Sequence, residues 1–168
     1  PDIIYIGNIR DEATMRAALT ATELGTFVRT TFHTINAVQT IVRIVNFFPP
    51  HLHDEIRMQL SMILKGTVSL RLLPRKDGQG VVLALEILFV NSAVSALIRD
   101  NKPFQLPSVM QTGRNVGMQT FSDELTRLAV KGIITAEDAY MKAVDKADIE
   151  TKFQLAGLSL DFKKKAEE

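Results

Sequence analysis

The sequence predicts an α/β protein whose first half mixes strands and helices and whose second half is helical. Residues 3–6 and 26–32 are short apolar or β-branched runs typical of strands, and a segment with helical spacing separates them. Residues 67–74 and 81–89 form a second pair of strand-like runs, joined by the turn sequence KDGQG. Because strands joined through a helix are usually parallel and hairpin strands antiparallel, we expect one pair of each kind.

The opening segment, PDIIYIGNIRD, predicts a buried strand followed by a helix. The apolar run of residues 3–6 breaks at Gly7. Asp11 is suited to cap the following helix, because its carboxylate can accept from the free amides of the first turn, and Gly25 is suited to end it. The chain starts at Pro1 without an initiator methionine, so we expect it to be a fragment of a longer protein.

The next segments predict a strand and two further helices. The strand of residues 26–32 precedes a helix that Asn36 can cap and that Pro49–Pro50 stops. A third helix is expected to begin near His51, with Gly66 closing it.

The second half contains two helix starts with a clear local signature. After a short helix at residues 93–100, Thr120 and Thr135 each stand three residues before an aspartate, in the pattern of a helix cap with an acidic third position. Acidic side chains in a first turn also suit the helix dipole.

Composition limits the classes of function. The 168 residues include no cysteine, which excludes disulfides and thiolate metal sites and fits a cytoplasmic protein. A net charge of +1 gives no overall attraction to nucleic acid or membrane. No apolar stretch reaches the roughly 18–20 residues of a membrane-spanning helix.

Polar residues mark the ends of the first two strands. Gly7 and Asn8 mark the end of the first strand, and residues 31–34, which include Thr31 and His33, mark the end of the second. In open α/β sheets ligands bind beyond the carboxyl ends of the strands, so this edge is the predicted site.

The order and spacing of these segments resemble the PilT-type type IV pilus retraction ATPases of the secretion-ATPase superfamily. The stretch PDIIYIGNIRDEATMRAALTATELGTFVRTTFHT resembles that family's Walker B strand, the helix after it and its histidine box. NAVQTIVRIVNFFPPHLHDEIRMQLSMILKGTVSLRLLPRKDGQG resembles the segment after the box, and AVSALIRD stands where the family carries an AIRNLIRE-like motif. QTGRNVGMQTFSDEL and VKGIITAEDAY resemble its C-terminal helical region.

The resemblance implies a partial RecA-like P-loop ATPase core at residues 1–90 and an α-helical subdomain at residues 91–168. The core would lack its phosphate-loop half, because no G-x-x-x-x-G-K-[ST] motif is present. The complete protein would be a cytoplasmic hexamer, peripheral to the inner membrane, that uses ATP and Mg²⁺ to retract pili and drive twitching motility. An inner-membrane pilus platform protein and related motor ATPase subunits would be its partners, and the isolated chain should bind ATP poorly.

The resemblance also implies site residues. Asn8 and His33 would be catalytic, at the Walker B glutamate and at the second histidine of the box, whereas Thr26 replaces the first histidine. The residues expected on the nucleotide side are Gly7, Arg10, Asp11 and Thr31, and no metal ligand is assigned.

Each of these roles has a structural alternative. Asn8 or Asp11 could cap a helix, and His33 could be a structural hydrogen-bonder.

Two departures from the family bear on function. An amide at position 8 cannot take a proton from water, so hydrolysis is expected to fall by about 10²–10⁴-fold unless another carboxylate substitutes. This leaves open a catalytically degenerate paralogue that regulates or scaffolds an active motor, and a DNA-translocating or secretion ATPase is a third option. Ser95 and Ala96 replace an Arg-Asn pair of the AIRNLIRE-like motif, which puts retraction in question, and Arg99 is retained.

Other side-chain patterns favour no function. His51 and His53 point roughly 200° apart on a helix and should not form a metal site. Arg71, Arg75 and Lys76 lack interleaved aromatics, so nucleic-acid binding is not expected.

Overall fold

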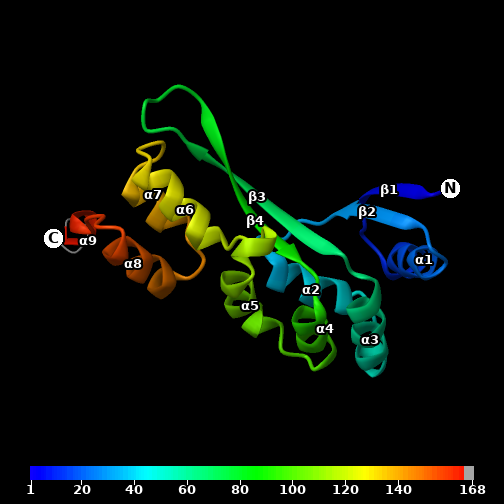
Figure 1. The fold of residues 1–168 in the computed structure, drawn as a ribbon. Coiled ribbons are helices and arrows are strands. Elements are labelled where there is room, and N and C mark those ends of the chain that lie inside the picture. Colours follow the sequence, from blue (N-terminus) through cyan, green and yellow to red (C-terminus); the bar gives the residue numbers. More distant parts are fainter. Residues whose placement is uncertain (165–168) are drawn as a thin grey trace.

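The computed structural model describes residues 1–164 and forms an elongated molecule built on a long hairpin. Figure 1 shows the hairpin running across the molecule, with the blue amino-terminal strands at one end and the red carboxyl-terminal helices at the other. The predicted helical subdomain extends to residue 168, and its last four residues lie outside the described part.

The first sheet consists of two parallel strands, β1 (Ile3–Asn8) and β2 (Phe27–Thr31), joined through α1 (Glu12–Glu23). The predicted parallel pair is confirmed. Asp11 caps α1 by accepting from the backbone N–H of Thr14 at 2.8 Å, as expected. Gly25 follows α1 with a φ of +93°, the left-handed conformation in which glycine is favoured.

The prediction that the first strand is buried is wrong for half of its residues. Its side chains alternate between two faces, and Ile3 and Tyr5 are 68% and 64% exposed. Ile6, on the opposite face, packs on the core that includes Met15 and Leu19 of α1. Among residues 1–164, helices cover only one face of this sheet, so an apolar run that resembles a fully buried strand has one uncovered side.

Two helices follow β2. α2 (Ala37–Val45) is capped by the Asn36 side chain, which accepts from the Gln39 N–H at 2.8 Å, as predicted. The helix ends before Pro49–Pro50. A 3₁₀ turn, η1 (Pro50–Leu52), leads into α3 (His53–Ile63).

The hairpin is formed by β3 (Gly66–Pro74) and β4 (Val81–Phe89), which pair antiparallel along their whole length. Gly66 is therefore the first residue of a strand and not the closing residue of α3, which ends at Ile63. The reason is a close contact, since a Cβ on Gly66 would lie 2.6 Å from the backbone oxygen of Leu88 on the partner strand.

The second half is helical, as predicted. Thr120 and Thr135 cap their helices by accepting from the backbone N–H groups of Asp123 and Asp138. In chain order the elements are α4 (Ser92–Arg99), η2 (Pro103–Gln105), α5 (Leu106–Thr112), η3 (Arg114–Val116), α6 (Phe121–Val130), α7 (Ala136–Lys142), α8 (Lys146–Leu155) and α9 (Asp161–Lys164).

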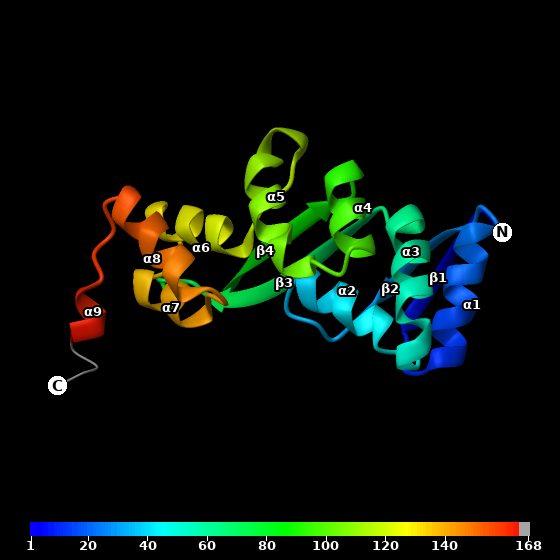
Figure 2. The same ribbon diagram turned by 90° about the horizontal axis from the view of Figure 1, so that it is seen from below.

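The helices pack on one side of the hairpin in two hydrophobic clusters (Figures 1 and 2). One cluster joins α1 to α5 with Leu88 near the end of β4. The other joins α6 to α8 with Leu73 and Ala84, farther along the hairpin. Among residues 1–164, no helix is both long and apolar enough to cross a membrane.

Candidate nucleotide-phosphate site

The predicted site lies where β1 and β2 end side by side. The strands pair in register from Ile3 with Phe27 to Ile6 with Thr30, and then Asn8 pairs with Thr31. The register therefore shifts at Gly7, as in a β-bulge, which changes the direction of the following side chain. Parallel strands bring both carboxyl ends to one edge of the sheet, so local sequence and topology together position the polar residues.

Asn8 and His33 contact each other directly at this edge. The Asn8 side-chain nitrogen lies 3.2 Å from His33 Nε2. An amide NH₂ can only donate, so in this contact the imidazole Nε2 is the acceptor. His33 is exposed and Asn8 is half-buried, so the ring is open to a ligand while the amide holds its orientation.

Gly7 and Thr31 join the same edge. The Thr31 hydroxyl donates to the backbone oxygen of Gly7, which ties the ends of the two strands together. A Cβ on Gly7 would meet nothing within 4 Å, so packing among the described residues does not require glycine there. Thr26, at the position of the family's first histidine, lies at the other end of β2, where its hydroxyl contacts the Pro1 oxygen at 3.3 Å.

Two arginines complete a hollow of about 300 Å³ around the Asn8–His33 pair. Arg10 lines it from the loop after β1 and Arg43 from α2, with Ile9 and Phe32 as apolar neighbours. No lining residue is acidic, and neither arginine forms an ion pair with any of residues 1–164. The hollow therefore carries positive charge that the described side chains leave unneutralised.

Arg43 was not predicted from the sequence. It is the one charged residue of α2, whose other positions are apolar or small and neutral apart from Gln39. A single charge on such a helix was the available signal, but the side of the molecule that it faces depends on how α2 packs against α3, β3 and β4.

Asp11 does not line the hollow, because its carboxylate caps α1. Its oxygens accept from the Thr14 N–H at 2.8 Å and from the Thr14 hydroxyl at 3.0 Å. These bonds, the backbone one foremost, lower the pKa of Asp11 below its usual value. The helix-cap alternative therefore accounts for its contacts.

The chemistry of the hollow fits phosphate oxygens and not a metal ion. Arginine, histidine and amide N–H groups donate hydrogen bonds to phosphate. Mg²⁺ is usually bound through one or more carboxylates, and the residues that line this hollow provide no carboxylate.

Helix α4, which contains most of the AVSALIRD segment, contacts α3 and does not line this hollow. The Ser95 hydroxyl donates to the Ser61 oxygen at 2.7 Å. Val94 and Ile98 are completely buried and form the inner face of the helix. Arg99 is half-exposed and lies 3.6 Å from Asp100.

The two histidines before and in α3 have no common ligand position. His53 Nε2 lies 2.8 Å from the Phe48 oxygen, which gives it a structural contact. Residues 1–164 contain no group of three or more potential ligands suited to a metal ion.

Comparison with known proteins finds similar sequences over most of the chain. Residues 1–79 match the Type II/IV secretion system protein family. The chain is 44% identical over 143 residues to the twitching motility protein of Neisseria gonorrhoeae, covering 85% of this chain and 38% of that protein. It is 43% identical over 143 residues to the type IV pilus retraction ATPase PilT of Pseudomonas aeruginosa, covering 85% of this chain and 41% of that protein.

A solved structure extends the likeness to three dimensions. The crystal structure of the pilus retraction motor PilT with bound ADP matches with a TM-score of 0.81 and 43% identity, covering 90% of this chain and 42% of that one. The predicted ATPase-core fold is thereby confirmed. The chain spans about two fifths of the length of these relatives. Its first 79 residues match the Type II/IV secretion system protein family, and over most of its length the chain is similar to the pilus retraction motors.

Proposed function

We propose that this chain provides part of the nucleotide site of a pilus retraction ATPase. The contact between Asn8 and His33, flanked by two unpaired arginines at the shared edge of parallel strands, carries the proposal. The matched retraction motor has ADP bound, and the donors gathered here suit the phosphate groups of such a ligand.

Each residue has a defined task in this proposal. Arg10 and Arg43 neutralise the terminal phosphate group, and His33 forms a hydrogen bond to it from the adjacent strand. Asn8 orients His33 and can orient water, but its amide has no proton-accepting capacity for general-base catalysis. The hydrogen bond from the Thr31 hydroxyl to the Gly7 backbone oxygen stabilises this edge of the sheet.

The complete protein would act as a cytoplasmic homohexamer peripheral to the inner membrane. ATP would bind at a subunit interface with Mg²⁺ held outside this hollow. Retraction would require an inner-membrane pilus platform protein and related motor subunits. The likeness to pilus motors supports this assignment.

A second candidate is a degenerate paralogue that regulates or scaffolds an active motor. It is favoured by one observation: the hollow around Asn8 has a neutral amide and no carboxylate among its described lining residues. General-base help is worth about 10²–10⁴-fold in rate, so its loss would leave weak hydrolysis.

Phosphate release by the complete protein carrying this chain distinguishes the two candidates. The assay uses ATP with Mg²⁺ and compares the native protein with Asn8→Glu. Strong native activity that the substitution does not raise supports the motor and excludes the paralogue. Weak native activity that rises by about 10²-fold or more supports the paralogue. A native protein that binds no ATP contradicts both.

A further inference from the structure

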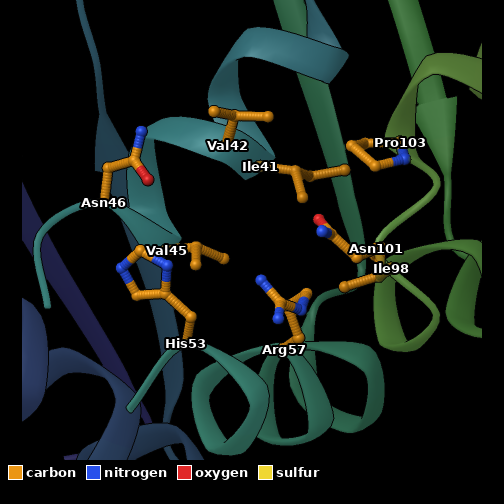
Figure 3. Close-up of a pocket in the computed structure, with 9 residues that line it drawn as sticks. All are labelled: Ile41, Val42, Val45, Asn46, His53, Arg57, Ile98, Asn101 and Pro103. Carbon is orange, nitrogen blue, oxygen red and sulfur yellow. The ribbon is translucent and has the colours of Figure 1, made fainter. Parts of the chain in front are cut away.

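A second pocket lies between α2, α3 and the segment after α4, apart from the Asn8–His33 edge (Figure 3). Its volume is about 200 Å³. Apolar side chains form much of its wall, and four polar side chains also line it. The apolar ones are Ile41, Val42, Val45, Ile98 and Pro103, and the polar ones are Asn46, His53, Arg57 and Asn101.

Arg57 is the central polar group of this pocket. Figure 3 shows its guanidinium pointing from α3 into the space between His53 and Asn101. Its side chain is only 13% exposed, and its Nε is buried without a hydrogen-bond partner in the described part of the chain. A guanidinium offers five N–H donors, and a buried donor without an acceptor destabilises the folded protein.

The one acid beside Arg57 does not satisfy it. Arg57 Nη2 contacts Asp54, but the Asp54 side chain is 95% exposed. Ion pairs with a carboxylate so open to water contribute little to stability. His53 Nε2 already contacts the Phe48 oxygen at 2.8 Å, so that atom is not available as an acceptor.

Asn101 adds a second polar group to the pocket wall. Its φ of +56° makes it the one non-glycine residue with positive φ among residues 1–164. Asparagine tolerates this conformation after a helix, and here its amide points into the pocket (Figure 3). A glycine could hold the same backbone, so Asn101 offers a substitution that removes the side chain alone.

We propose that this pocket binds a carboxylate group carried on a short aliphatic stem. A carboxylate matches the planar donor edge of a guanidinium, and a single negative charge balances the single cation of the pocket. The apolar wall residues would contact the stem. A phosphate group fits less well, because its second charge would find no further cation among the lining residues.

The test uses the complete protein carrying this chain and 4,4,4-trifluorobutyrate, observed by fluorine NMR. We expect a dissociation constant on the order of 1–10 mM, as for a small ligand with one ion-paired group. Arg57→Met should weaken binding by about tenfold or more, and Asn101→Gly by a smaller factor. Arg75→Met removes an arginine from the hairpin turn and should leave binding unchanged.

Thermal unfolding of the same variants separates ligand binding from a structural role. Because Arg57 has an unsatisfied buried donor, Arg57→Met should keep or raise the unfolding midpoint without ligand. A large fall in the midpoint would mean that Arg57 supports the fold. The proposal would then be decided by trifluorobutyrate binding to Asn101→Gly, and unchanged binding in that variant would refute it.

Two further binding measurements, with inorganic phosphate and with peptides, identify the ligand class and its source. Inorganic phosphate that binds more tightly than trifluorobutyrate, and loses this binding in Arg57→Met, would overturn the carboxylate assignment. An end-blocked peptide with one glutamate, compared with its glutamine counterpart, shows whether an acidic side chain of a protein can enter. Binding of the free acid alone restricts the site to small carboxylates, and binding of neither probe refutes the proposal.

Discussion

The buried carboxylate of Glu86 on β4 is predicted to hold two helix starts in place. Its Oε1 accepts from the backbone N–H of Ala37, the first residue of α2, at 2.7 Å. The backbone N–H of Phe121, the first residue of α6, stabilises the same carboxylate. Amides in the first turn of a helix have no acceptor within the helix, so Glu86 supplies one to a helix of each hydrophobic cluster.

The expected cost of removing this carboxylate follows from those two contacts. Ala37 is completely buried, so Glu86→Ala leaves its amide without an acceptor and without access to water. An unsatisfied buried group costs about 1–3 kcal/mol, and the Phe121 amide is also affected, so we expect a loss of about 2–4 kcal/mol in unfolding free energy. Glu86→Gln keeps an acceptor oxygen and should cost about 1 kcal/mol or less.

Glu86 also predicts a pH dependence with a definite sign. Burial raises the pKa of Glu86 above its ordinary value, despite the hydrogen bonds from Ala37 and Phe121. The folded state therefore binds this proton more tightly than the unfolded state does. Its contribution to stability is complete below the ordinary carboxyl pKa and is lost as the pH rises through the raised value.

Urea denaturation of the chain, followed by circular dichroism at several pH values, tests both the stability cost of removing the Glu86 carboxylate and the predicted pH dependence. The unfolding free energy of the native chain minus that of Glu86→Gln should fall as the pH rises from below about 4.5 and then level off. Glu23→Gln, at an exposed carboxylate, is the control and should show no such trend. A cost below about 1 kcal/mol for Glu86→Ala, or a flat difference for Glu86→Gln, would refute the reasoning.

Two other predictions concern the close backbone contact at Gly66 and the positive charge of Arg43 in the proposed phosphate site. Gly66→Ala should destabilise the chain by about 1–3 kcal/mol in urea denaturation, because the new Cβ would lie 2.6 Å from the Leu88 oxygen. Gly7→Ala, with open space around it, should cost nothing comparable, and equal losses would contradict this view. Arg43→Gln in the complete protein should raise KM for ATP by about tenfold or more, whereas Lys131→Gln, on the exposed end of α6, should not. An unchanged KM would remove Arg43 from the site.

Much of the local structure could be predicted because its causes lie within a few residues. The caps at Asp11, Asn36, Thr120 and Thr135 each depend on a side chain and an amide three positions along. The sequence also predicted that Asn8 and His33 lie at one edge, since parallel strands joined through a helix end there, and the structure adds their direct contact.

The sequence by itself therefore determined the order of elements, their starts and the edge at which the polar strand ends meet. Only the tertiary structure decided which side chains gather from distant segments: Arg43 beside His33, Arg57 in its pocket, and Glu86 between two helix starts. It also decided that Ile3 and Tyr5 face outward, because an apolar run does not say how many faces its neighbours cover. Hydrogen bonds within a turn are fixed by spacing along the chain, whereas burial and charge environment depend on packing between elements far apart in sequence.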